Sequence, residues 1–207
     1  ILTFNKEASV FKEEVKLDAI SGATDSWGKN FSPGNNYKNI KTNEFTQSQE
    51  FYGKQFLVKD QLKPIAWIIG KESKQIGNYL SFKATATIPT EDLTWYDFSW
   101  DELRNADGNE TSSEETTSTT EVEAWYTPQI PTSHGPFEYW GLPGLILEVK
   151  VGNTIIACSE IILNTKEKIK IEPSGKGKIV SKFEYKDIIT MKMTEMRDNR
   201  GRRRAGF

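Results

Sequence analysis

Residues 80–88 alternate strictly between apolar and polar side chains, and this pattern limits the fold more than any other segment. Leu80, Phe82, Ala84, Ala86 and Ile88 are apolar, and the residues between them are Ser, Lys or Thr. A period of two is typical of a strand with one face in a core and the other toward solvent. The chain is therefore predicted to build at least one sheet around this segment.

Other extended segments follow one another along the chain. Residues 122–127 and 145–150 alternate in the same way, and Gly152 and Asn153 are typical of a hairpin turn that leads into a partner strand over 154–163. We also predict strands over 1–5 and 8–14, joined by a turn at 5–7. Polar, half-exposed strands are predicted over 37–51 and 56–59, with a turn at 52–53. A further strand is predicted over 66–69, before a turn at 70–73. Consecutive antiparallel pairing is the simplest arrangement.

Two segments have the composition of loops. Residues 18–36 contain mainly Gly, Ser, Asn and Asp around the isolated Trp27 and Phe31, which predicts a long surface loop. Residues 107–120 consist almost only of Gly, Asn, Glu, Ser and Thr. Such a segment buries too little apolar surface to offset its conformational entropy, so we predict a flexible loop or hairpin tip.

One helix is predicted near the C-terminus. Ser181 and Glu184 form a capping-box pattern, Asp187 adds negative charge early, and Arg197 and Arg200 lie late, as the helix dipole favours. The predicted fold class is therefore mainly β, with a curved antiparallel sheet or partly open barrel of about eight or more strands and a C-terminal helix. The 207 residues are predicted to form one domain, 1–207.

Composition excludes several functions. With 27 basic and 29 acidic side chains the net charge is −2, which gives no overall attraction to nucleic acid. The single His134 and the single Cys158 exclude a His-rich metal site and an internal disulfide. Residues 141–149, the longest apolar stretch, include a Pro and are far shorter than the roughly 20 residues of a transmembrane helix. We therefore predict no metal, no nucleic-acid partner and no transmembrane segment.

Few residues could carry catalysis. His134 lies in a loop where a general base is conceivable, but a serine-elbow motif is missing, so an ordinary loop histidine is favoured. Glu121 and Glu123 share a strand face, and two solvated carboxylates are favoured over a catalytic pair. A calcium loop is not indicated by the acidic residues Asp92, Asp97, Asp101 and Glu102. Their spacing differs from that of an EF-hand loop, and the glycine of such a loop is missing. We predict no catalytic residue and no cofactor.

The basic tail, residues 198–207, is a separate candidate for binding. Residues 192–207 hold six basic and two acidic side chains, a local charge of +4 in a chain of −2. Arginine-rich ends attract phosphate groups of RNA or lipids, although a solvated tail that docks on an acidic protein surface, or does nothing, is favoured. The arginines of interest are Arg202, Arg203 and Arg204.

A motif of two glycines and a proline precedes the strand at 145–150. It reads Gly141, Leu142, Pro143, Gly144, Leu145 and Ile146. The glycines permit a bend or a positive φ where a loop enters a strand, and Pro143 stiffens it, so a structural role is favoured. The alternative is an aromatic platform for a ligand or peptide beside this bend, formed by Trp125, Tyr139 and Trp140.

These six residues resemble the motif for which the GLPGLI family is named. Residues 124–128, the pair 135–136, residues 139–141 and the segment 156–164 resemble the family in order and spacing, and the resemblance extends from about residue 37 to 197. It implies an exported protein of Bacteroidetes-type bacteria, often found beside TonB-dependent receptors, and thus a place in the periplasm or at the outer membrane. It also implies a further N-terminal strand that pairs with the first hairpin.

Relatives often carry a cysteine at the position of Ser81 and a second in the strand that holds Cys158, which implies a disulfide that this chain lacks. We predict a buried thiol at Cys158. The function expected from these features is a non-enzymatic accessory or binding subunit of an exported outer-membrane assembly. The alternatives are a periplasmic carrier of a lipid or peptide, resembling the half-barrels of lipoprotein carriers, and, as the least favoured, an enzyme.

Overall fold

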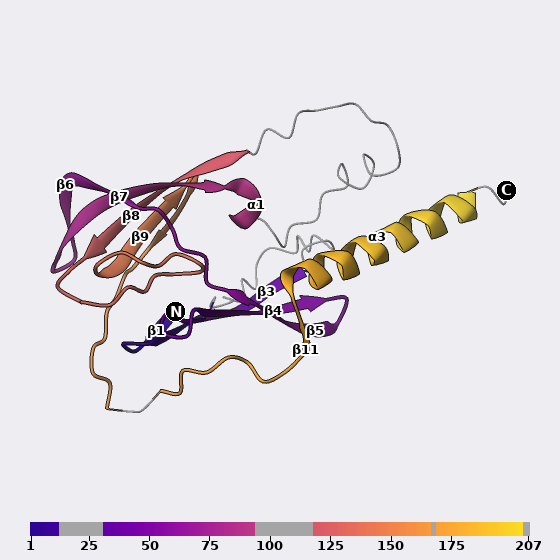
Figure 1. Ribbon diagram of the computed structural model, residues 1–207, viewed down its shortest axis with the longest axis horizontal. Helices are drawn as coiled ribbons and strands as arrows, with labels where there is room; N and C mark the ends of the chain where they lie inside the picture. The colour runs from indigo at the N-terminus through magenta and orange to yellow at the C-terminus, as the bar shows by residue number, and fades with distance from the viewer. Residues whose placement is uncertain (13–30, 94–117, 167–168, 205–207) are drawn as a thin grey trace, which may run out of the picture.

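The computed structural model describes residues 1–12, 31–93, 118–166 and 169–204, and these residues form two β-sheets and a long C-terminal helix (Figure 1). The six-stranded sheet, here sheet A, has the order β1-β2-β3-β4-β5-β11, and the five-stranded sheet, sheet B, has the order β10-β9-β8-β7-β6. The predicted fold class, mainly β with a C-terminal helix, is confirmed, and neither sheet closes into a barrel.

Sheet A is antiparallel between sequence neighbours and gains one parallel strand from far along the chain. The first five strands pair consecutively, and β11 pairs in parallel with β5 through Ile179 opposite Leu57. The strands are β1 (Leu2–Phe4), β2 (Ala8–Phe11), β3 (Phe31–Asn39), β4 (Glu44–Phe51), β5 (Lys54–Gln61) and β11 (Lys178–Val180). The predicted turns at 5–7 and 52–53 both join antiparallel neighbours.

Sheet B is antiparallel throughout and contains the segment that alternates most clearly. Ala84 and Ala86 are buried while Thr85 and Thr87 are exposed, as the period of two predicts. Gly152 has a φ of 54° in the hairpin turn between β9 and β10. The strands are β6 (Ile68–Ile76), β7 (Tyr79–Pro89), β8 (Thr119–Thr127), β9 (Leu145–Val151) and β10 (Thr154–Ala157), and a short helix, α1 (Thr90–Leu93), follows β7.

The C-terminal helix α3 (Lys182–Arg204) begins with the predicted capping box. The Ser181 backbone N–H donates to Glu184 Oε2 at 2.7 Å, and the Glu184 N–H donates to Ser181 Oγ at 3.2 Å. Its buried face, with Tyr185, Ile189 and Met193, packs on sheet A, and its C-terminal end projects past the sheets (Figure 1). Among the described residues, no helix is long and apolar enough to cross a membrane.

Several predicted boundaries were wrong. Residues 31–36, placed in a loop, begin β3, because pairing with β4 organises a segment of polar composition. The predicted strand 37–51 is interrupted by a turn at 40–43, where Asn43 takes a φ of 56°. The predicted partner strand 154–163 ends at Ala157. The remainder of the loop 18–36 lies outside the described residues.

Two further corrections concern sheet B. The predicted turn at 70–73 is a bulge inside β6, where the pairing with β7 shifts between Ile69 and Ser73. The predicted loop 107–120 lies outside the described residues except for its end, where Thr119 and Thr120 already pair in β8.

The polar strands of sheet A are more buried than predicted. Lys38, Asn36 and Gln47 lie on the same face by their register, and each is almost fully buried. Composition alone suggested half-exposed strands. It could not show that another part of the chain covers this face.

Candidate functional site at the junction of the two sheets

The loop between β8 and β9 joins sheet B to sheet A. We call residues 132–144 the junction loop. Lys38 of β3 donates from Nζ to the carbonyl oxygens of Gly135 and Tyr139, at 2.6 and 2.9 Å. His134 Nε2 lies 3.1 Å from the carbonyl oxygen of Asn5, in the turn between β1 and β2. Polar side chains therefore fasten the loop before the motif to sheet A.

The two motif glycines meet different geometric demands. Gly141 has a φ of +94°, in the region where a side chain is strained. At Gly144 a Cβ atom would clash with the carbonyl oxygen of Thr127, at a separation that real Cβ atoms essentially never show. The loop passes so near the end of β8 that only glycine fits at Gly144. This geometry supports the structural interpretation of the motif.

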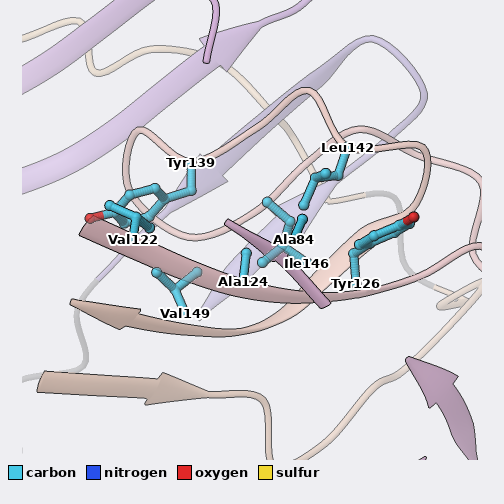
Figure 2. Close-up of a cluster of buried hydrophobic side chains, with 8 residues drawn as sticks. All are labelled: Ala84, Val122, Ala124, Tyr126, Tyr139, Leu142, Ile146 and Val149. Atoms are coloured by element: carbon cyan, nitrogen blue, oxygen red, sulfur yellow. The ribbon is translucent and has the colours of Figure 1, made fainter. Parts of the chain in front are cut away.

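The apolar residues of the motif belong to the core of sheet B. Leu142 is 1% exposed and Ile146 is 3% exposed, and both pack with Tyr139 against β7, β8 and β9 (Figure 2). The junction loop thus covers one face of sheet B with apolar side chains and contacts sheet A through two backbone carbonyls and the His134 ring.

A pair of tryptophans ties the linker between the sheets to the same loop. Trp67 Nε1 donates to the carbonyl oxygen of Trp140 at 2.8 Å, and Trp140 Nε1 donates to the carbonyl oxygen of Lys63 at 2.8 Å. Residues 62–67 connect β5 of sheet A to β6 of sheet B. Trp140 therefore acts as a clamp on this linker.

The structure does not bring the three predicted platform residues together on one surface. Trp125 is 7% exposed, and the Lys74 ammonium lies 4.3 Å from the centroid of its ring. Its ring N–H donates to Glu123. The neighbouring residues Ala124 and Tyr126 belong to the core of sheet B, whereas Trp125 does not. Tyr139 is buried in that core (Figure 2). Arg202, Arg203 and Arg204 form the last turn of α3, at its projecting end (Figure 1).

Among the predicted candidates for catalysis that the structure describes, Glu121 is exposed, Glu123 and Asp92 are paired, and His134 is buried. Glu123 accepts a hydrogen bond from Trp125, and its carboxylate lies 3.2 Å from Lys83 Nζ. The hydrogen bond from Trp125 lowers the pKa of Glu123 most, and the interaction with Lys83 lowers it further. His134 has no exposed surface. Asp92 pairs with Lys63, and Asp97, Asp101 and Glu102 lie outside the described residues. Within the described ranges, no three metal-ligating side chains gather at one place.

Burial dominates the electrostatics of the junction. It lowers the pKa of Lys38 to about 7, against the charge of Glu138, which raises it. Burial and the Lys38 charge lower the pKa of His134 to about 4, although the hydrogen bond to Asn5 opposes them. Sequence reasoning missed Lys38, because a lysine between Tyr37 and Asn39 in a polar strand carries no local sign of burial.

A pocket of about 190 Å³ adjoins the junction. The end of β5 and the linker, residues 61–66, line it with the end of β7 and α1, together with Phe45, Glu138, Tyr139 and Lys182. The pocket is therefore the space at the junction where a small group could bind.

Cys158, away from the junction, is half-buried, whereas a buried thiol was predicted. Its Sγ donates to the carbonyl oxygen of Glu160, and partial burial raises the pKa of the thiol.

Comparison with known families supports the resemblance carried by the motif. Residues 67–148 match a family described as "Protein of unknown function (Porph_ging)". This Bacteroidetes family is the GLPGLI family, and its model matches the part of the chain that contains the motif. No curated protein matches the chain.

Two solved structures of PNGF-II are similar in fold. The structure in the C2 space group has a TM-score of 0.51 and 18% identity, covering 89% of this chain and 28% of that chain. The structure in the P21 space group has a TM-score of 0.46 and 16% identity, with the same coverage. The chain thus spans little more than a quarter of PNGF-II, and the first likeness supports a shared fold only.

Proposed function

We propose that this chain is a non-enzymatic accessory subunit that binds another protein of an exported assembly at the outer membrane. A TonB-dependent receptor is the partner that the family setting suggests, and the periplasm or the outer membrane is the proposed location. One observation carries this proposal: an exposed apolar strand edge at β10.

The β10 edge consists of β10 and the segment that follows it, residues 154–163. Ile155 is 59% exposed, Ile162 is 68% exposed and Leu163 is 47% exposed. β10 is the last strand of sheet B, so its outer side carries no neighbouring strand among the described residues. An edge with free backbone groups and apolar side chains can add a strand from a partner.

The opposite edge of sheet B is built differently. β6 contains a bulge between Ile69 and Ser73, and it carries Lys71 and Lys74. Bulges and lysines are the features by which proteins protect an edge against pairing. β10 carries neither feature, which favours it over β6 as the binding edge. The full burial of His134 likewise favours binding over catalysis, because a buried imidazole cannot reach a substrate.

Ile155→Asp is expected to abolish recovery of a partner when the full chain is purified from its native host. A charge on an exposed apolar edge opposes docking, while the fold is retained because surface substitutions change stability by only about 0.5 kcal/mol. Ile179→Asp, at a 62% exposed isoleucine of β11, is the matched control and is expected to retain the partner. The readout is the set of proteins that co-purify.

Recovery of the unaltered chain as a free monomer, with no membrane protein attached, would contradict the proposal. The same purification, followed by native mass spectrometry, tests the second candidate, a carrier of a lipid or peptide. The pocket beside the junction favours that candidate, although its size suits a short segment better than a lipid chain, because ligand pockets span about 300–1,000 Å³. A bound small molecule in place of a protein would favour the carrier.

A further inference from the structure

The buried lysine of the junction has hydrogen-bond acceptors for its neutral form only. A neutral amine has two hydrogens, and an ammonium has three. Lys38 Nζ has two acceptors among the residues that the structure describes, the carbonyl oxygens of Gly135 and Tyr139. Lys38 is 0% exposed, so bulk solvent does not reach its amine. A proton added to Lys38 would therefore place an unpaired N–H and a charge in the interior.

His134 shows the same match to its neutral form. Nε2 lies 3.1 Å from the carbonyl oxygen of Asn5, so it carries the hydrogen. Nδ1 is buried and has no hydrogen-bond partner in the part of the chain that the structure describes. A neutral imidazole tolerates a bare Nδ1, whereas an imidazolium would need an acceptor there. Lys38 and His134 thus both connect the junction loop to sheet A, at the neighbouring residues His134 and Gly135. Each makes its contacts in the uncharged state.

The remaining neighbours offer little to balance two new charges. Glu138 of the junction loop faces Lys38, and Lys38 is the charged group that faces His134. By register, β2 places Ser9 and β4 places Phe45 beside Lys38. β1 places Phe4 near His134, with ring centroids 6.2 Å apart. One carboxylate therefore stands against two cations when both groups are protonated.

We propose that the junction is a proton-sensitive latch: it holds the junction loop on sheet A while Lys38 and His134 are neutral, and it releases the loop when they take up protons. Release would expose the carbonyl oxygens of Gly135 and Tyr139 and separate the segment before the motif from sheet A. The latch is independent of the partner proposed above.

The direction follows from proton binding in the two states. With the loop open, Lys38 and His134 have the ordinary pKa values of 10.5 and 6.5, and with the loop closed they have pKa values of about 7 and about 4. The open state binds more protons wherever the pH lies between the two values of a group, so lowering the pH favours opening. From about pH 8.5 to about pH 5.5, Lys38 alone raises the opening constant about 30-fold and His134 about 10-fold further.

Hydrogen exchange of the full chain at these two pH values measures the opening. The reporters are the amides of Gly141 and Ile146, because their acceptors, the carbonyl oxygens of Ser133 and His134, lie in the segment that moves when the latch opens. After correction for the intrinsic effect of pH on exchange, their protection is expected to fall about 300-fold on acidification. Lys38→Met should reduce this fall to about 10-fold, and Lys38→Met with His134→Gln should abolish it. Lys41→Met, at an exposed lysine, is the control and should leave the fall unchanged.

Unchanged protection in the unaltered chain, or a full pH dependence in Lys38→Met, would overturn the latch. A second measurement needs no variant: the chemical shift of the Lys38 side-chain Cε, followed by NMR, should titrate near neutral pH. Titration above about pH 10, the ordinary range of a lysine, would also overturn it.

Discussion

Gly144→Ala is expected to lower the free energy of unfolding by about 3 kcal/mol or more. The added Cβ would clash with the carbonyl oxygen of Thr127 and lie 2.8 Å from the backbone nitrogen of Pro128. Both are backbone atoms at the end of β8, so neither can rotate away as the tip of a flexible side chain can. Relief requires the junction loop to move off sheet B. Urea denaturation followed by circular dichroism measures the loss.

Gly175→Ala is the matched control for this substitution. A Cβ at Gly175 would meet no atom within 4 Å, and its φ lies outside the strained region. Alanine there is expected to leave stability unchanged or to raise it by up to about 1 kcal/mol, because it restricts the unfolded chain. Equal midpoints for Gly144→Ala and Gly175→Ala would show that Gly144 is not required by the close approach to Thr127.

Leu142→Ala is expected to cost about 2–5 kcal/mol of stability. Leu142 is 1% exposed and lies in the core cluster of sheet B near Ala84, Tyr126 and Ile146 (Figure 2). Its loss would remove apolar contacts and leave a cavity beneath the junction loop. Thermal or urea unfolding provides the measurement.

The control for the size change is Ile162→Ala, at a side chain that is 68% exposed. This change removes a similar apolar surface that is already in water, so its effect is expected to stay within about 0.5 kcal/mol. If Leu142→Ala were as mild as Ile162→Ala, the motif leucine would not be part of the core.

Local patterns predicted the parts of the fold in which neighbouring segments pair with each other. The alternation at 80–88 and the turn at Gly152 correctly indicated β7 and the hairpin of β9 and β10, because each depends on residues close in sequence. Ser181 and Glu184 marked the start of α3 for the same reason. The capping box is a contact over three residues, and its signal is complete in the sequence.

Contacts between distant segments were outside the reach of those patterns. The parallel pairing of β11 with β5 joins residues more than a hundred positions apart, and the division into two sheets depends on a linker that reads as an ordinary coil. The burial of Lys38 likewise depends on a loop about a hundred residues further along the chain. No periodicity in β3 could indicate what covers it.

The candidate site was predicted in part. The glycines of the motif indicated a backbone constraint, which Gly141 and Gly144 show in two different forms. The aromatic residues around the motif could be found in the sequence, but the sequence did not show that they lie apart in the folded chain. Trp125 and Tyr139 lie on different faces of sheet B, and Trp140 hydrogen-bonds to the linker through a partner, Trp67, that the sequence did not single out.

We expect the two sheets to form one cooperative unit, because Lys38, His134 and Trp140 connect the junction loop and the linker to both of them, and this claim is central to the account of the fold. Native-state hydrogen exchange of the unaltered chain in increasing denaturant tests it most directly. The best-protected amides of β4 and β5 in sheet A and of β8 and β9 in sheet B are predicted to share one opening free energy and one dependence on denaturant. A clearly lower opening free energy for sheet A than for sheet B would show that the sheets unfold separately, and would contradict the claim.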